Sequence, residues 1–205
     1  EDQALVFLYM SSEQLDKDSY LILINDFLAQ YPNSPEGYIR LANYYLASGD
    51  ASQYALADEN MKKALDVATQ KDEAHYQVAK TIYSYMISLE EGQEAYKEWS
   101  YEKALELIRK AVQSSAQPIH IQLEGDILFA QGNYADAFEA YNKVNQTSFA
   151  SAATFYSASK AKQLTEGSNM NEVLALMDSA IVKLSKPYFG EAAPYFYERA
   201  ELRAQ

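Results

Sequence analysis

The chain has 205 residues, of which 48% are hydrophobic and 22% charged, so it is long and apolar enough to fold around a core. Its formal net charge of −12 opposes binding to the phosphates of nucleic acids or to an anionic membrane. The absence of cysteine excludes disulfides and thiolate metal sites, and no apolar run approaches the roughly 18 residues of a membrane span, so we expect no membrane insertion.

Helical periodicity dominates from the start of the chain. Residues 1–31 predict a helix pair with a turn near Asp16. The second helix of this pair carries an apolar stripe and ends before Pro32, which cannot continue a helix. A new helix is predicted to begin at Pro35 and to end at residues 48–50, where Ser-Gly-Asp is a stop signal. A second helix follows to about residue 70, so residues 35–70 form a helix–turn–helix unit.

This unit recurs along the chain. The glycines at 49, 92, 132 and 167 fall in predicted turns and are separated by 43, 40 and 35 residues. Such a period is typical of stacked helical hairpins and not of a coiled coil. We expect the small residues Gly125 and Ala137 to let two helices approach closely. We expect Tyr134 and Tyr141 to fill gaps to the neighbouring hairpin.

The clearest copy of the unit covers residues 121–144. Its Gly125, Gly132, Tyr134, Ala137 and Tyr141 have the spacing of a tetratricopeptide repeat (TPR), which this segment therefore resembles. Residues 38–64 resemble that repeat less closely. The unit that contains Gly92 is about twelve residues longer than the family's repeat, which we expect to lengthen its helices.

The resemblance implies an all-α fold, an α–α superhelix (solenoid) of about five stacked antiparallel helix pairs plus a final helix. We predict a single TPR-like domain over residues 1–205. Its units are expected at residues 1–34, 35–71, 72–116, 117–149, 150–190 and, as a partial unit, 191–205. Because the last unit stops near Arg199, we expect the array to belong to a longer stack.

No catalytic constellation is present in the sequence, and we expect the protein not to be an enzyme. Phosphate-binding glycine loops, nucleophile elbows and paired metal-binding histidines are all missing. His75 and His120, the only histidines, are expected at the surface or in capping positions near helix starts. We therefore expect no metal and no cofactor.

The resemblance also implies a concave groove lined by the first helix of each pair, where such arrays hold a peptide or helix. It places eight expected partner-binding residues there: Asn43, Gln77, Thr81, Tyr85, Gln122, Asp126, Phe129 and Lys162. The alternative is that these residues are solvated on an unused face. Ile39, Gln77 and Thr81 stand where chaperone-binding relatives need basic or amide residues, which argues against binding of a chaperone tail. We expect the groove to be neutral to acidic and its ligand to be apolar or basic.

The expected function is that of a non-enzymatic protein–protein interaction scaffold, which binds a peptide or helix of a protein partner. The alternative is a structural or oligomerisation module, or an exported ligand-binding repeat domain attached to a larger protein. Since the chain begins at Glu1 without a methionine, we expect an exported, periplasmic bacterial protein, with a cytoplasmic one as the alternative.

Two apolar segments lie outside the repeat signature. The run at residues 5–10 is expected to pack on the following helix, and it could form a homodimer through the terminal helices. Trp99 lies beside Tyr96 and Tyr101 in the long unit, and we expect it in the core between helices. An exposed aromatic anchor for a partner is the alternative for Trp99.

Overall fold

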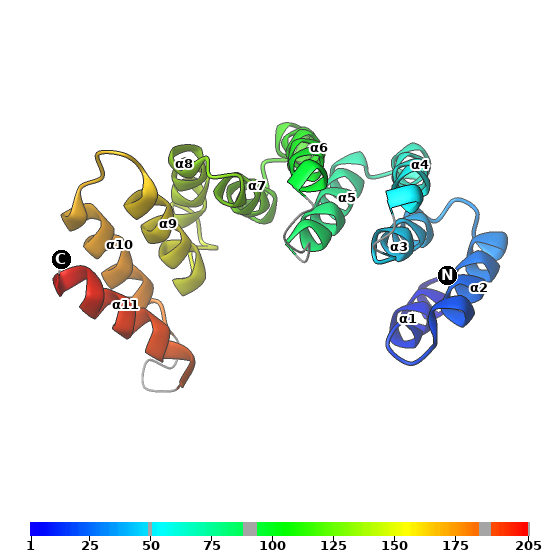
Figure 1. The fold of residues 1–205 in the computed structure, drawn as a ribbon, viewed down its shortest axis with the longest axis horizontal. Coiled ribbons are helices and arrows are strands. Elements are labelled where there is room, and N and C mark those ends of the chain that lie inside the picture. Colours follow the sequence, from blue (N-terminus) through cyan, green and yellow to red (C-terminus); the bar gives the residue numbers. More distant parts are fainter. Residues whose placement is uncertain (49–50, 88–93, 185–189, 205) are drawn as a thin grey trace. The chain divides into compact units, whose positions relative to one another are not determined.

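The computed structural model of the chain describes residues 1–48, 51–87, 94–184 and 190–204. Within these ranges it contains eleven α-helices, two short 3₁₀ helices and no strand (Figure 1), which confirms the predicted all-α class. In the same ranges, no helix combines the length and the apolarity needed to span a membrane. The helices in chain order are α1 (Asp2–Ser11), α2 (Lys17–Gln30), α3 (Pro35–Leu46), α4 (Tyr54–Val67), α5 (Lys71–Met86), α6 (Glu94–Ser114), α7 (Pro118–Ala130), α8 (Tyr134–Asn145), α9 (Ala152–Leu164), α10 (Met170–Val182) and α11 (Ala193–Ala204).

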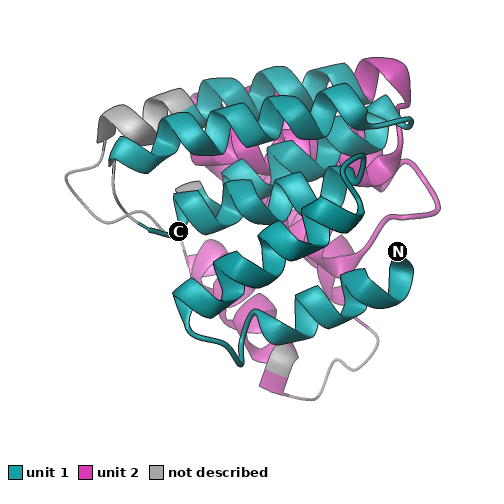
Figure 2. Cartoon of the chain, turned by 90° about the vertical axis from the view of Figure 1, so that its right-hand side faces the viewer, with its two compact units in different colours: residues 1–111 teal, residues 112–205 magenta. Residues whose placement is uncertain are grey.

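The chain divides into two compact units, residues 1–111 and 112–205, which are coloured separately in Figure 2. We call them unit 1 and unit 2 and describe each by itself. The predicted repeat ranges stay predictions, and α5 begins at Lys71, just before the predicted range of its pair. The predicted single domain stays a prediction. With 16 and 21 residues, α5 and α6 are longer than the other described helices, as expected for the expanded unit.

Local sequence signals explain where several helices begin. Pro35 and Pro118 occupy the first turn of α3 and α7, where a residue without an N–H is tolerated. Asp16 is the N-cap of α2 and accepts a hydrogen bond from the Ser19 backbone N–H, at 3.0 Å. The turn before α2 therefore lies just upstream of Asp16 and not across it. Gly132, in the turn between α7 and α8, has a φ of +83°, which a side chain would strain.

The core of unit 1 is built from the apolar faces of successive helices. Leu8, Ile24, Phe27 and Leu41 form one buried cluster that joins α1, α2 and α3. The approach of α3 to α2 depends on Gly37, because a Cβ there would lie 2.6 Å from Leu28 Cδ2. This close packing positions the exposed face of α3, which is part of the candidate site.

The core of unit 2 contains the best repeat signature, in the α7–α8 hairpin. Tyr141 packs on Gly125 within the α7–α8 hairpin, since a Cβ at Gly125 would lie 2.9 Å from Tyr141 Cε1. Tyr134 stacks edge-on against Phe129 of the same hairpin, with ring centroids 5.3 Å apart. Both tyrosines thus make contacts within their own hairpin, and the prediction that they fill gaps to a neighbouring hairpin stays a prediction. The missing side chain of Gly125 opens the space inside the hairpin itself.

Candidate functional site

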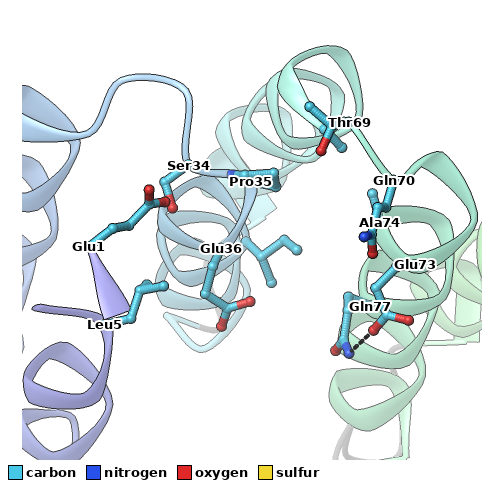
Figure 3. A pocket seen from close by; sticks show the side chains of 12 residues that line it. Glu1, Leu5, Ser34, Pro35, Glu36, Thr69, Gln70, Glu73, Ala74 and Gln77 are labelled. Carbon is cyan, nitrogen blue, oxygen red and sulfur yellow. Dashed lines mark hydrogen bonds between the residues drawn. The ribbon is translucent and has the colours of Figure 1, made fainter. Parts of the chain in front are cut away.

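Two adjoining cavities lie within unit 1. The first has a volume of about 470 Å³ and is lined by residues at the start of α1, the start of α3 and the first turns of α5 (Figure 3). The second has a volume of about 200 Å³ and lies between α3 and α5. Glu36, Ile39 and Gln77 line both cavities. We call the two cavities together the α3–α5 groove.

The helical period places the groove residues on one face of each helix. Glu36, Ile39, Arg40 and Asn43 of α3 follow the spacing i, i+3, i+4 and i+7. The same spacing brings four residues of α5 to the other wall of the second cavity, namely Gln77, Lys80, Thr81 and Ser84. Because α3 and α5 are in contact, the two stripes face one another.

Most of the polar groups in the groove are amides and hydroxyls. In the first cavity, Ser34, Thr69 and Gln70 accompany the apolar side chains of Leu5 and Pro35. Figure 3 shows Glu36 on α3 across the cavity from Glu73 and Gln77 on α5. Such groups both donate and accept hydrogen bonds, so they can match the alternating N–H and C=O groups of a peptide backbone.

The charges in the groove are unevenly placed. Glu73 lines only the first cavity, where its carboxylate accepts a 2.7 Å hydrogen bond from Gln77 Nε2. Arg40 and Lys80 line only the second cavity. Arg40 forms an ion pair with Glu36 at 2.9 Å, while Lys80 Nζ lies 5.9 Å from the centre of the Tyr76 ring. The expectation of a neutral to acidic groove was therefore wrong for the second cavity, because Arg40 and Lys80 were not assigned to the groove from the sequence.

The structure places the four predicted groove residues of unit 1 in two different settings. Asn43, Gln77 and Thr81 line the second cavity together. Tyr85 lies outside the lining of both cavities and instead pairs with Tyr54 of α4. The two rings are 5.9 Å apart at their centroids, and their hydroxyls are hydrogen-bonded to each other.

The sequence prediction missed further residues of the α3–α5 groove. Three of them lie one helical turn from a predicted residue: Arg40 from Asn43, Lys80 from Gln77 and Ser84 from Thr81. A search at i±3 and i±4 around Asn43, Gln77 and Thr81 would have found these three.

The predicted groove residues of unit 2 contact neighbouring side chains of that unit. Asp126 accepts a 2.8 Å hydrogen bond from the hydroxyl of Tyr141, and burial raises the pKa of this carboxyl group, while the hydrogen bond lowers it by less. Phe129 packs on Tyr134, as described above. Lys162 forms a 2.8 Å ion pair with Glu172 of α10 and lies 4.9 Å from the centre of the Phe138 ring of α8. Gln122 is half-buried on α7.

The internal contacts of unit 2 also show how α9 aligns with α7. Ser159 is fully buried, and its hydroxyl donates a 3.0 Å hydrogen bond to the Val173 carbonyl of α10. Ser159 therefore lies close to α10, the second helix of its hairpin, as Gly125 of α7 lies close to α8. With Ser159 equivalent to Gly125, Tyr156 is equivalent to Gln122 and Lys160 to Asp126. Lys162 does not share their face, because neighbouring residues differ by about 100° around a helix.

The two histidines and the acidic side chains are the residues on which catalytic or metal chemistry was considered from the sequence. In the described residues there is no group of three or more histidine, aspartate or glutamate side chains that could hold a metal ion. His120 lies in the first turn of α7 and is fully buried, with its Nδ1 2.9 Å from the Ser115 carbonyl oxygen. A surface position, one of its two expected settings, is therefore wrong, while the capping position stays a prediction. His75 is half-buried, and burial lowers its pKa. The side chain of Trp99, for which a core role and an anchor role were the alternatives, lies outside the described residues.

The helix pairs and their packing define the class of fold: a TPR-like helical-repeat protein. No protein-family model and no curated protein matches the chain. Solved structures that resemble it include a thermophilic TPR protein of Thermus thermophilus, with a TM-score of 0.61, 14% identity, and coverage of 100% of this chain and 99% of that one.

Two further solved structures share the fold. YrrB is described as a TPR protein with an unusual peptide-binding site, and it matches with a TM-score of 0.60, 18% identity, and coverage of 95% of this chain and 90% of YrrB. PilF of Pseudomonas aeruginosa matches with a TM-score of 0.57, 16% identity, and coverage of 99% of this chain and 91% of PilF. At these identities the likeness establishes the TPR-like fold.

Proposed function

We propose that this protein is an interaction scaffold that binds an extended peptide segment of a partner protein in the α3–α5 groove. The observation that carries the proposal is the pair of adjoining cavities that share Glu36, Ile39 and Gln77. The likeness to YrrB, whose description includes a peptide-binding site, supports a peptide as the ligand.

The chemistry of the groove favours an extended segment. The N–H and C=O groups inside a helix are already paired, so α3 and α5 must recognise a peptide backbone through side chains. Asn43, Gln77 and Thr81 supply donors and acceptors for it. Ile39 lies at the junction of the two cavities and offers an apolar contact for one side chain of the ligand.

The uneven charges orient the bound segment. A basic side chain of the ligand gains most beside Glu36 and Glu73 in the first cavity. An acidic side chain gains most beside Arg40 and Lys80 in the second. The preferred segment therefore carries a basic residue, an apolar residue and an acidic residue in a fixed order.

Selection and mutation together test the proposal. Peptides are selected from a phage-displayed random library on the intact chain, and their affinity is measured by fluorescence anisotropy. The triple variant Asn43→Ala, Gln77→Ala and Thr81→Ala is expected to bind them roughly 100-fold more weakly, because three hydrogen bonds of about 1 kcal/mol each are lost. A matched triple variant changes exposed polar residues outside the groove: Gln30→Ala, Gln113→Ala and Asn171→Ala. Equal affinity for both triple variants would rule out the groove as the binding site.

A second candidate function, self-association, is favoured by the outer face of α1. Val6, Phe7, Tyr9 and Met10 are each about three-fifths exposed, while the opposite face of α1 packs on α2 and α3 through Leu8. The exposed surface of these four side chains is on the order of 400 Å² per copy. This is about half of the area that each partner buries in a stable interface. We therefore propose a weak, concentration-dependent contact with the α1 of a second copy.

Sedimentation velocity over a range of concentrations tests this second candidate. Phe7→Glu is expected to abolish any concentration-dependent increase in mass. Ile22→Glu on α2, an equally exposed position, serves as the control and is expected to leave it unchanged. A wild-type chain that stays monomeric at the highest concentrations would refute the contact.

A further inference from the structure

The last described helix, α11, packs on α9 and α10 of unit 2 through a small apolar contact. Leu202 is 4% exposed and packs against Val173 and Met177 of α10. The Tyr195 ring stacks edge-on against Tyr156 of α9, with centroids 5.0 Å apart. Leu202 is the one buried residue in α11, whereas several residues of α9 and of α10 are buried. Apolar burial alone therefore holds α11 less firmly than its neighbours.

Polar contacts supply the rest of the α11 attachment. Glu198 accepts a hydrogen bond from the Tyr156 hydroxyl at 2.5 Å, and its second carboxylate oxygen lies 3.2 Å from Lys160 Nζ. Burial, followed by the hydrogen bond and charge of Glu198, raises the pKa of Tyr156, so this hydroxyl stays protonated and donates. Arg199 forms an ion pair with Asp178 of α10 at 2.5 Å.

The contacts of α11 follow a recognition pattern for a helix in a groove. Tyr195, Glu198, Arg199 and Leu202 lie at i, i+3, i+4 and i+7 and so share one face of the helix. On α9 they meet Tyr156 and Lys160, the residues equivalent to the predicted groove residues Gln122 and Asp126 of α7. The α11 helix thus occupies, in unit 2, the kind of surface that the sequence assigned to partner binding.

We propose that the surface formed by Tyr156, Lys160, Val173, Met177 and Asp178 is an exchangeable helix-docking site, and that α11 is its intramolecular occupant. The ligand that replaces α11 is an amphipathic helix of a partner protein. It carries an aromatic residue, an acidic residue, a basic residue and a leucine at the four spacings of α11. This site lies in unit 2 and is independent of the proposed α3–α5 groove.

Competition within one chain makes the proposal measurable. A tethered helix acts at a high effective concentration, so a free helix binds only to the fraction of molecules from which α11 has detached. Weakening the tethered α11 without touching α9 or α10 must therefore strengthen the binding of a free helix. A permanently docked end helix predicts no such effect.

The probe is a fluorescently labelled synthetic peptide with the sequence of residues 190–204, titrated against the full chain. Binding to the variant Glu198→Lys, Leu202→Ala is expected to be at least about tenfold tighter than binding to the wild type. Lys160→Glu is added to the Glu198→Gln variant and not to the double variant, in which residue 198 is basic and would pair with it within the chain. This addition is expected to abolish binding of the probe, and a peptide that itself carries Glu198→Lys is expected to restore it. The single variant Glu198→Gln provides a milder weakening of α11, and circular dichroism verifies that each variant keeps its helix content.

Three results would overturn the proposal. In the first, the peptide binds the wild type and both weakened variants with equal affinity. In the second, Lys160→Glu leaves the affinity of the peptide unchanged. In the third, the charge-swapped peptide does not restore binding. Restoration of binding by the charge swap requires direct contact between residues 160 and 198. Non-specific adhesion of the peptide would not depend on these two charges.

Discussion

Replacing Gly125 by alanine tests how the α7–α8 hairpin is packed. The new Cβ would lie 2.9 Å from Tyr141 Cε1 and 3.0 Å from Cδ1, which is too close, so the ring must shift. Overpacking of this kind costs about 2 kcal/mol. Moving the ring also disturbs the hydrogen bond between Tyr141 and Asp126, which costs about 1 kcal/mol.

A favourable contribution offsets part of that cost. Alanine is about 1 kcal/mol better than glycine inside a helix. The expected net loss in the free energy of unfolding is therefore about 2 kcal/mol, measured by urea unfolding followed by circular dichroism. In the background Tyr141→Val, which lacks the ring atoms that clash, the same substitution is expected to stabilise the protein by up to about 1 kcal/mol.

The change of sign between the two backgrounds is the decisive result. If Gly125→Ala costs the same with and without the Tyr141 ring, the close approach of ring and helix does not determine the packing of this hairpin. The same conclusion follows if Gly125→Ala stabilises the wild-type chain.

Three further predictions concern unit 2. Gly132→Ala is expected to reduce the free energy of unfolding by about 1 kcal/mol in urea melts, because the positive φ of +83° strains any side chain; no change would mean that the turn relaxes freely. Ser151→Ala is expected to cost about 1 kcal/mol in thermal melts, because it removes the capping box with Thr154 at the start of α9, and an unchanged melting temperature would contradict this role. Because burial raises the pKa of Asp126 above its ordinary value of 3.8, folding favours its protonated form. The contribution of this group to the free energy of unfolding is therefore largest below pH 3.8 and falls as the pH rises through the raised pKa. Asp126→Asn is expected to remove this fall in pH-dependent unfolding curves, and an identical pH profile for the variant would refute it.

The sequence was most informative about local structure. Pro35 and Pro118 mark helix starts, and Gly132 marks a turn, because each acts on its own backbone and the next turn of chain. The helix-pair period followed from the same signals, and it predicted the class of fold. Small positions such as Gly125 also indicated where two helices come close, although not which aromatic side chain would fill the space.

The candidate groove was predicted only in part. Asn43, Gln77 and Thr81 line one cavity, but Tyr85 pairs with Tyr54, and the basic residues Arg40 and Lys80 were not anticipated. In unit 2, the sequence placed Lys162 of α9 in the groove. The alignment of α9 with α7 in the structure instead makes Lys160 the residue equivalent to the predicted groove residue Asp126. On a helix each residue of such a difference rotates the side chain by about 100°, so a small alignment error selects another neighbour.

Composition, helix limits and repeat period were thus determined by the sequence itself, because they depend on backbone preferences and on contacts within one or two turns. The tertiary structure alone decided the burial of His120, the pairing of Tyr141 with Gly125, the balance of charge in the α3–α5 groove and the docking of α11 on α9 and α10. These features join residues of different helices, often far apart in the chain. Their energies depend on distance and burial in space, which no local pattern in the sequence records.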